Sequence, residues 1–78
     1  VRSMPNQQTE LDALFAALAD PTRRAILARL AHGPAPVSDL ARPFDMALPS
    51  FLGHLRRLED GGLIETTKQG RVRTCAIR

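Results

Sequence analysis

The stretch that decides the fold reads LPSFLGHLRRLED (residues 48–60) and continues as GGLIETTKQGRVRTCAI (residues 61–77). In its first part, apolar side chains recur at helical spacing within about 120° of arc. These side chains are Leu48, Phe51, Leu52, Leu55 and Leu58. The pattern then changes to the alternation of β-strands in two runs, residues 63–68 and 71–77, which leaves Gln69-Gly70 as the expected turn. We therefore expect an amphipathic helix followed directly by a β-hairpin.

Three more helical patterns precede this stretch. They run over about residues 10–19, 21–31 and 37–42 (or 44). Thr9 and Asp20 are the expected N-caps, and Pro21 suits a first helical position because no N–H is needed there. The resulting order of four helices and two strands predicts a mainly α fold with a β-hairpin. We assign residues 9–78 to this domain and residues 1–8 to a flexible N-terminal arm.

Length and composition exclude several classes of protein. With 78 residues, of which 44% are hydrophobic, the chain is one small globular domain. The single cysteine, Cys75, excludes an intrachain disulfide framework and a cysteine-rich zinc site, so oligomerisation is the expected source of extra stability. The sequence holds no membrane-length apolar run, and we expect a cytoplasmic protein. It also holds no paired carboxylates, phosphate-binding glycine loop or nucleophilic triad, so we expect no enzyme, cofactor or resident metal.

Charge is distributed unevenly along the chain. Residues 1–40 hold four basic and four acidic side chains, whereas residues 41–78 hold seven basic and four acidic ones. The whole formal net charge of +3 therefore lies in the second half. A basic half favours a polyanionic partner, with double-stranded DNA first, although an ordinary solvated surface also carries such charge.

Residues 37–60 form two expected helices joined by a short turn, and the second has small and basic residues on its free face. This arrangement is typical of a helix-turn-helix, with the hairpin over residues 63–77 as its wing. Small side chains let a helix approach base edges, while arginines reach phosphates or a guanine edge. The candidate DNA-binding residues are Ser38, Pro49, Ser50, Gly53, His54, Arg56, Arg57, Lys68, Arg71 and Arg73.

Several of these candidates also have a purely structural explanation. The arginines at 56 and 57 could pair with the acids at 59 and 60 on the same helix surface. His54 could pack beside the helix over residues 37–42, and Ser50 could cap the start of its own helix. The wing cations could form nothing more than a solvated hairpin tip.

The first helix carries one apolar stripe, and its opposite side is mostly alanine. The stripe consists of Leu11, Leu14, Phe15 and Leu18. We take it as the candidate dimer interface, although the same spacing would serve an internal core. Cys75 is either a small packed residue or a redox switch. Its spacing from His32 and His54 does not suggest a shared metal site.

Five motifs occur in order along the chain. They are LADPTRRAIL (18–27), VSDLA (37–41), HLRRLE (54–59), GGLI (61–64) and QGR (69–71). Together they resemble the ArsR/SmtB-type family of winged helix-turn-helix transcriptional repressors, over about residues 11–77. The segment FDM (44–46), with Pro49 three positions on, resembles a subgroup of that family without the known metal ligands.

The resemblance implies a sequence-specific DNA-binding transcriptional regulator, a homodimeric repressor of an inverted-repeat operator, released by an effector that the sequence leaves unknown. Family members usually continue past the wing into a last helix that builds the dimer with the first helix. We therefore expect a trimmed form of a longer regulator. Leu52 and Gly53 depart from the family, which often has polar residues at these positions. Two alternatives stay open: a winged-helix protein-interaction module without DNA binding, and a metal- or redox-responsive sensor of the same fold.

Overall fold

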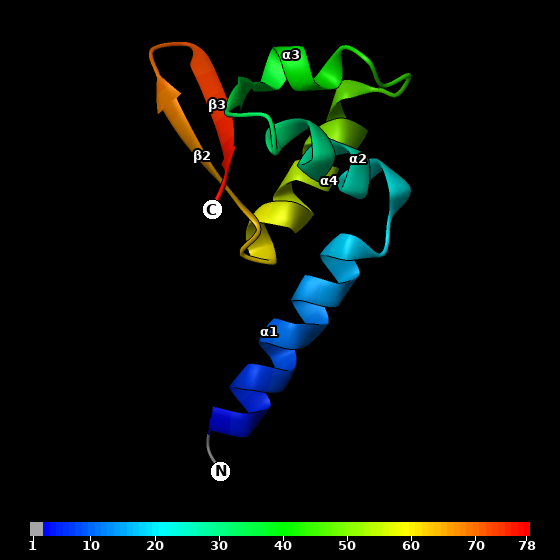
Figure 1. Cartoon of the computed structure of the whole chain (residues 1–78), viewed down its shortest axis with the longest axis vertical. Coiled ribbons are helices and arrows are strands. Elements are labelled where there is room, and N and C mark those ends of the chain that lie inside the picture. The colour runs from blue at the N-terminus through cyan, green and yellow to red at the C-terminus, as the bar shows by residue number, and fades with distance from the viewer. Residues whose placement is uncertain (1–2) are drawn as a thin grey trace.

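A computed structural model describes residues 3–78 of the chain, with side chains from Gln7 onward. Within this part the chain forms four α-helices and three β-strands (Figure 1). The elements are α1 (Ser3–Leu18), α2 (Pro21–Leu30), β1 (Ala35–Pro36), α3 (Val37–Ala41), α4 (Leu48–Asp60), β2 (Ile64–Gln69) and β3 (Val72–Ile77). The predicted mainly α fold with a β-hairpin wing is confirmed.

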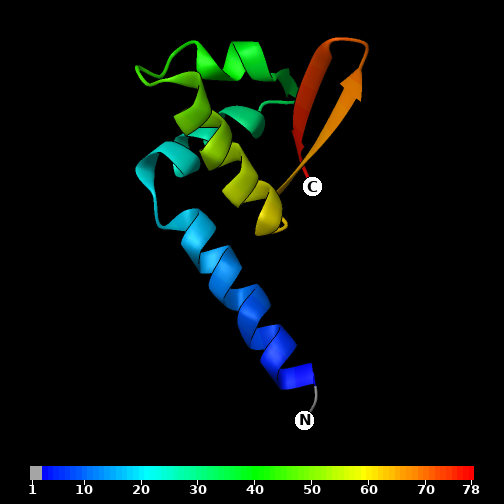
Figure 2. The same ribbon diagram turned by 180° about the vertical axis from the view of Figure 1, so that it is seen from behind.

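Helix α1 projects away from the other elements, while α3, the start of α4 and the hairpin tip gather at the opposite end (Figures 1 and 2). The expected arm is wrong over residues 3–8, which belong to this helix, and residues 1–2 lie outside the described part. Thr9 is therefore interior to the helix and is not its N-cap. Gln7, Gln8 and Glu10 are good helix formers, so the helix extends toward the N-terminus beyond the apolar pattern.

Two alanines of α1, at positions 13 and 17, make its closest approach to the rest of the protein. Ala17 is fully buried and Ala13 is half-buried. A Cβ atom added at Gly61, just after α4, would lie 3.0 Å from the Ala17 Cβ and 3.2 Å from the Ala13 carbonyl oxygen. Small residues on both sides thus allow close approach of α1 to the end of α4, and they leave Leu11 and Phe15 exposed.

The start of α2 is capped as predicted. The Asp20 carboxylate accepts a hydrogen bond of 3.1 Å from the backbone N–H of Arg23, and Pro21 occupies the first helical position. The helix ends at Leu30, one residue before the expected end, and buries Ile26 and Leu30.

The core lies between α2, α4 and the hairpin. It is formed mainly by Ile26, Leu30, Leu40, Phe51, Leu55, Leu58, Ile64 and Cys75. Helix α4 has the predicted bounds, but Leu48, the first residue of its apolar stripe, is 55% exposed. Phe51 is the first buried residue of α4, so the helix extends almost one turn beyond the core.

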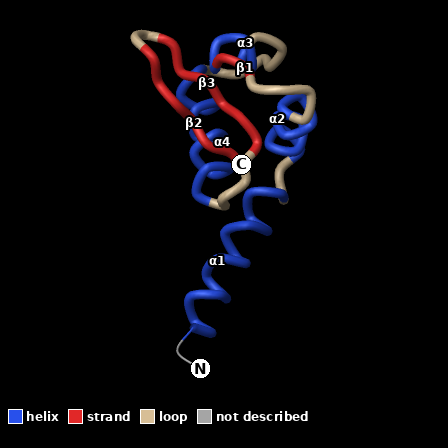
Figure 3. The backbone as a smooth tube through the Cα atoms, turned by 60° about the vertical axis from the view of Figure 1, so that its left-hand side comes forward, coloured by secondary structure: helices blue, strands red, loops and turns tan. Residues whose placement is uncertain are grey.

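The sheet has three strands in the order β1-β3-β2, and Figure 3 shows β1 beside β3. Strand β1 was not predicted because two residues are too few to show an alternating pattern. In the hairpin, Gln69 pairs with Val72, so the turn residues are Gly70-Arg71 and not Gln69-Gly70. Gly70 has φ of 61°, which the first position of a type II′ hairpin turn requires and glycine adopts without strain.

Candidate nucleic-acid interface

The free face of α4 is exposed along its whole length. Pro49, Gly53 and Arg56 follow one another at helical spacing on this face, and Ser50 and Arg57 flank them, all exposed. A Cβ atom added at Gly53 would meet nothing within 4 Å. The fold itself does not need glycine at position 53, so the absence of a side chain leaves room for a molecule outside the protein.

Arg56 and Arg57 do not form the ion pairs that were the structural alternative. Among the described residues, neither guanidinium lies within salt-bridge distance of Glu59 or Asp60. Glu59 instead accepts a hydrogen bond of 2.7 Å from the hydroxyl of Thr66, which joins the wing to α4. Both arginines are therefore exposed cations available to an anion.

The wing concentrates positive charge near its tip. Lys68 and Arg73 are opposite each other in the register of β2 and β3, and Arg71 is in the turn; all three are exposed. Like charges directly across a hairpin repel each other, and a bound anion would relieve that repulsion. Arg73 also lines a groove of about 330 Å³ together with Arg56, and the acids Glu59 and Asp60 line it as well.

Ser38 lies on a neighbouring groove of about 310 Å³. The groove is bordered by the start of α3, the start of α4 and the wing, and its lining includes Leu48, Leu52, Arg71, Val72 and Arg73. The structure thus brings Ser38 to the same groove as the wing residues Arg71 and Arg73.

His54 is the exception among the candidates. Its Nδ1 lies 3.1 Å from Nη1 of Arg23 and 3.7 Å from Oδ2 of Asp20, so the ring faces the start of α2. The alternative of packing beside residues 37–42 is therefore wrong. Desolvation raises the pKa of Asp20, but the backbone hydrogen bond from Arg23 and the charges of His54 and Arg23 outweigh it and hold this pKa below its ordinary value. His54 therefore joins α4 to the capping site of α2.

Two arginines that the sequence analysis did not single out fix α1 on α2. Arg23 donates from Nε to the Ala17 carbonyl and from Nη2 to the Ala16 carbonyl, both at 2.9 Å. Arg24 donates from Nη1 to the Leu18 carbonyl at 2.7 Å. These carbonyls belong to the last turn of α1, where the helix supplies no i+4 partner, and the Ala16 carbonyl also accepts from the backbone N–H of Ala19 at 3.2 Å. The arginines thus act as a C-terminal cap. Two arginines placed shortly after a helix end were the signal that could have revealed this role.

Cys75 is fully buried on the middle strand. Burial raises the pKa of its thiol, Glu59 raises it further and Arg73 opposes the shift, so the environment disfavours the reactive thiolate. The packed-residue interpretation therefore fits this site better than the redox switch. The described residues contain no cluster of three or more His, Cys, Asp or Glu side chains arranged to hold a metal ion.

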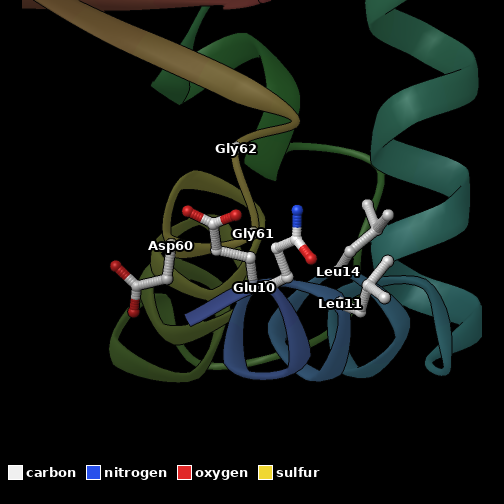
Figure 4. Close-up of a pocket in the computed structure, with 7 residues that line it drawn as sticks. Glu10, Leu11, Leu14, Asp60, Gly61 and Gly62 are labelled. Carbon is white, nitrogen blue, oxygen red and sulfur yellow. The ribbon is translucent and has the colours of Figure 1, made fainter. Parts of the chain in front are cut away.

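The apolar stripe of α1 does not belong to the core. Leu11 and Phe15 are 47% and 63% exposed, whereas Leu14 and Leu18 are half-buried. Leu11 and Leu14 also line a groove of about 570 Å³ between α1 and the end of α4, with Asp60 on its other side (Figure 4). In the part of the chain that the structure describes, no helix is long and apolar enough to cross a membrane.

Comparison with known proteins places this architecture in a family. Residues 18–67 match the model of a helix-turn-helix domain family. The HTH-type transcriptional regulator Rv2034 of Mycobacterium tuberculosis is 47% identical over 53 residues, which cover 68% of this chain and 50% of that protein. The transcriptional repressor SdpR of Bacillus subtilis is 35% identical over 60 residues, which cover 77% of this chain and 67% of that protein. The chain thus spans half to two thirds of the length of these relatives.

Two solved structures share the fold at high similarity. The crystal structure of an ArsR family transcriptional regulator is 68% identical, with a TM-score of 0.86 over 88% of this chain and 76% of that one. The solution structure of the homodimeric winged helix-turn-helix DNA-binding domain Mb0332 of Mycobacterium bovis, a possible ArsR-family regulator, is 27% identical. Its TM-score is 0.87 over 99% of this chain and 71% of that one. Fold, motifs and sequence identity agree: this chain belongs to the ArsR family of winged helix-turn-helix transcriptional regulators.

Proposed function

We propose that the protein is a sequence-specific DNA-binding transcriptional regulator that acts as a dimeric repressor on an inverted-repeat operator. The observation that carries this proposal is that an exposed, small-residue face of α4 and the exposed cations of the wing lie at the same end of the molecule. The relative SdpR is named a transcriptional repressor, which supports the negative sign of regulation. Such a regulator acts where the chromosome lies, in the cytoplasm.

In this mechanism α4 enters the major groove with its first residues toward the bases. Pro49, Ser50 and Gly53 present little bulk there, so the helix can approach the base edges closely. Arg56 and Arg57 bind phosphates along the groove, and Lys68, Arg71 and Arg73 bind the backbone beside the wing. Phosphate contacts set the position and much of the affinity, whereas contacts to base edges set the sequence preference.

The exposed stripe of α1 supplies the dimer contact in this proposal. Leu11 and Phe15 would be covered by the same residues of a second copy, with Leu14 and Leu18 at the edge. The structure of Mb0332 is described as homodimeric, which supports the same assembly here. Two-fold symmetry would place two copies of α4 in successive major grooves, about 34–36 Å apart.

The test is a binding titration of the full chain with a labelled duplex from its native upstream region, repeated over a series of salt concentrations. We expect the logarithm of the binding constant to fall linearly with the logarithm of the salt concentration. Arg71→Glu should weaken binding strongly. Arg29→Glu, the same charge change on an exposed residue of α2, should weaken it much less. Salt-insensitive binding, or equal effects of both variants, would contradict the proposal and favour a protein-interaction module.

A further inference from the structure

The end of α4 that points toward the proposed DNA is apolar. Leu48, at the first position of the helix, is 55% exposed, and Leu52 lies one turn further and is half-buried. In residues 48–54 the polar side chains are Ser50 and His54, and His54 is engaged with Arg23 and Asp20. The first two turns therefore offer one hydroxyl group and no arginine, asparagine or glutamine, the side chains that read bases by paired hydrogen bonds.

These leucines line a built groove. Leu48 and Leu52 form one wall of the 310 Å³ groove described above, and Val72 of the wing, itself 53% exposed, belongs to its lining. Arg71 and Arg73 also line this groove. A groove lined by apolar side chains and two arginines complements a surface that carries both negative charge and apolar groups.

The major groove of double-stranded DNA is such a surface. Phosphates run along its edges, and the C5-methyl group of thymine is the apolar feature that the bases present within it. Leu48 lies outside the core, because the first buried side chain of α4 is Phe51. An exposed leucine at the base-facing end of such a helix is therefore placed to contact a methyl group.

We propose that Leu48 and Leu52 read thymine methyl groups in the major groove, so that the operator half-site carries thymines where the start of α4 enters. This inference rests on the proposed function and adds to it the chemical group that sets sequence preference. Removing one methyl group that is buried on binding should weaken binding about fourfold.

The test replaces thymine by deoxyuridine, one position at a time, in the duplex that the full chain binds. This change removes the methyl group and keeps base pairing, and it does not depend on the folding of a variant. We expect about fourfold weaker binding at one or two positions of each half-site and no change elsewhere. Leu48→Ala should lower the affinity for the thymine duplex and erase the difference between thymine and deoxyuridine.

A matched control separates this effect from general loss of apolar surface. Ile77→Ala removes an apolar side chain of similar exposure, 45%, at the other end of β3, and should leave the preference for thymine unchanged. Equal affinity for thymine and deoxyuridine duplexes, with salt-sensitive binding retained, would overturn the inference and leave the proposed function standing. If Leu48→Ala instead changed the mass of the assembly in solution, Leu48 and Leu52 would be assigned to contact with a second copy of the chain, and the inference would be overturned. Absence of salt-sensitive binding to any duplex would overturn both proposals.

Discussion

The chain contains two pairs of consecutive arginines, Arg23-Arg24 and Arg56-Arg57, and the two pairs have different surroundings in the structure. The first pair lies just after the end of α1 and donates to three of its last carbonyls. The second pair lies in α4, is exposed, and has no ion pair with the acids that follow it within the described residues. Identical dipeptides thus serve stability in one place and remain available to a polyanion in the other. Position relative to a helix end, and not charge alone, decides between the two uses.

The largest expected effect comes from breaking the first pair. Arg23→Ala removes two hydrogen bonds to the end of α1, of which the one to Ala17 is half-buried and the one to Ala16 is exposed, together with the half-buried contact to His54. We expect a loss of about 2 kcal/mol in the free energy of unfolding, measured by urea denaturation. Arg29→Ala, in the last turn of α2 and exposed, is the control and should change stability by less than about 0.5 kcal/mol. Equal losses for the two variants would remove the distinction between capping and free arginines.

Replacing the second pair, Arg56-Arg57, should weaken DNA binding and leave stability almost unchanged. Arg56→Ala combined with Arg57→Ala should leave the free energy of unfolding within about 0.5 kcal/mol of the wild type, since both side chains are exposed. DNA affinity should fall at least about tenfold, and the slope of the logarithm of affinity against the logarithm of salt should decrease by about 2. Fluorescence anisotropy over a salt series measures both quantities. A large stability loss with an unchanged salt slope would assign this pair a structural role instead.

A smaller effect is expected at Gly53, where one substitution should raise stability and lower DNA affinity. Gly53→Ala adds a methyl group that meets nothing within 4 Å and removes the flexibility cost of glycine inside a helix. We expect the variant to be more stable by about 0.5–1 kcal/mol and to bind DNA more weakly, because the added group occupies the space between α4 and the bases. Thermal melts and binding titrations on the same preparation check the two signs. An increase in both stability and DNA affinity would mean that DNA does not approach α4 closely at position 53.

The smallest effect concerns acid stability at the start of α2. Because the pKa of Asp20 lies below its ordinary value in the folded protein, its carboxylate contributes stability above the unfolded pKa. This contribution is lost as pH falls through the folded pKa. Asp20→Asn keeps a capping side chain but cannot titrate, so melting temperature should depend less on pH below about pH 4 than in the wild type. An unchanged acid profile would show that Asp20 is not stabilised as its contacts indicate.

Much of the fold could be predicted because its signals are local. The bounds of α4 follow from helical spacing and the following glycines, and the start of α2 follows from Asp20 and Pro21. Strand β1 could not be predicted, since it exists only through pairing of Ala35 with Cys75, far along the chain. The exposure of Leu48 could not be predicted either, because helical spacing gives the direction of a side chain but not where the core stops.

In the candidate site, too, features that depend on local sequence patterns could be predicted and features that depend on distant contacts could not. The free face of α4 and the wing cations lie where the sequence analysis expected them, since both depend on local periodicity. His54 contacts Arg23, a residue 31 positions earlier, and no local pattern predicts such a contact. The burial of Cys75 likewise results from its place on the middle strand of a sheet whose third strand was not predicted.

The most direct measurement is amide chemical-shift mapping of the labelled full chain titrated with its upstream duplex. The account predicts that the largest changes occur at Ser50 and Gly53 on α4 and at Gly70 and Arg71 in the wing turn, and that they diminish at high salt. Amides of α1 around Leu11 and Phe15 should change little, because that face is assigned to the second copy. Changes centred on α1, or no saturable change at any residue, would contradict the assignment of α4 and the wing as the DNA-binding surface.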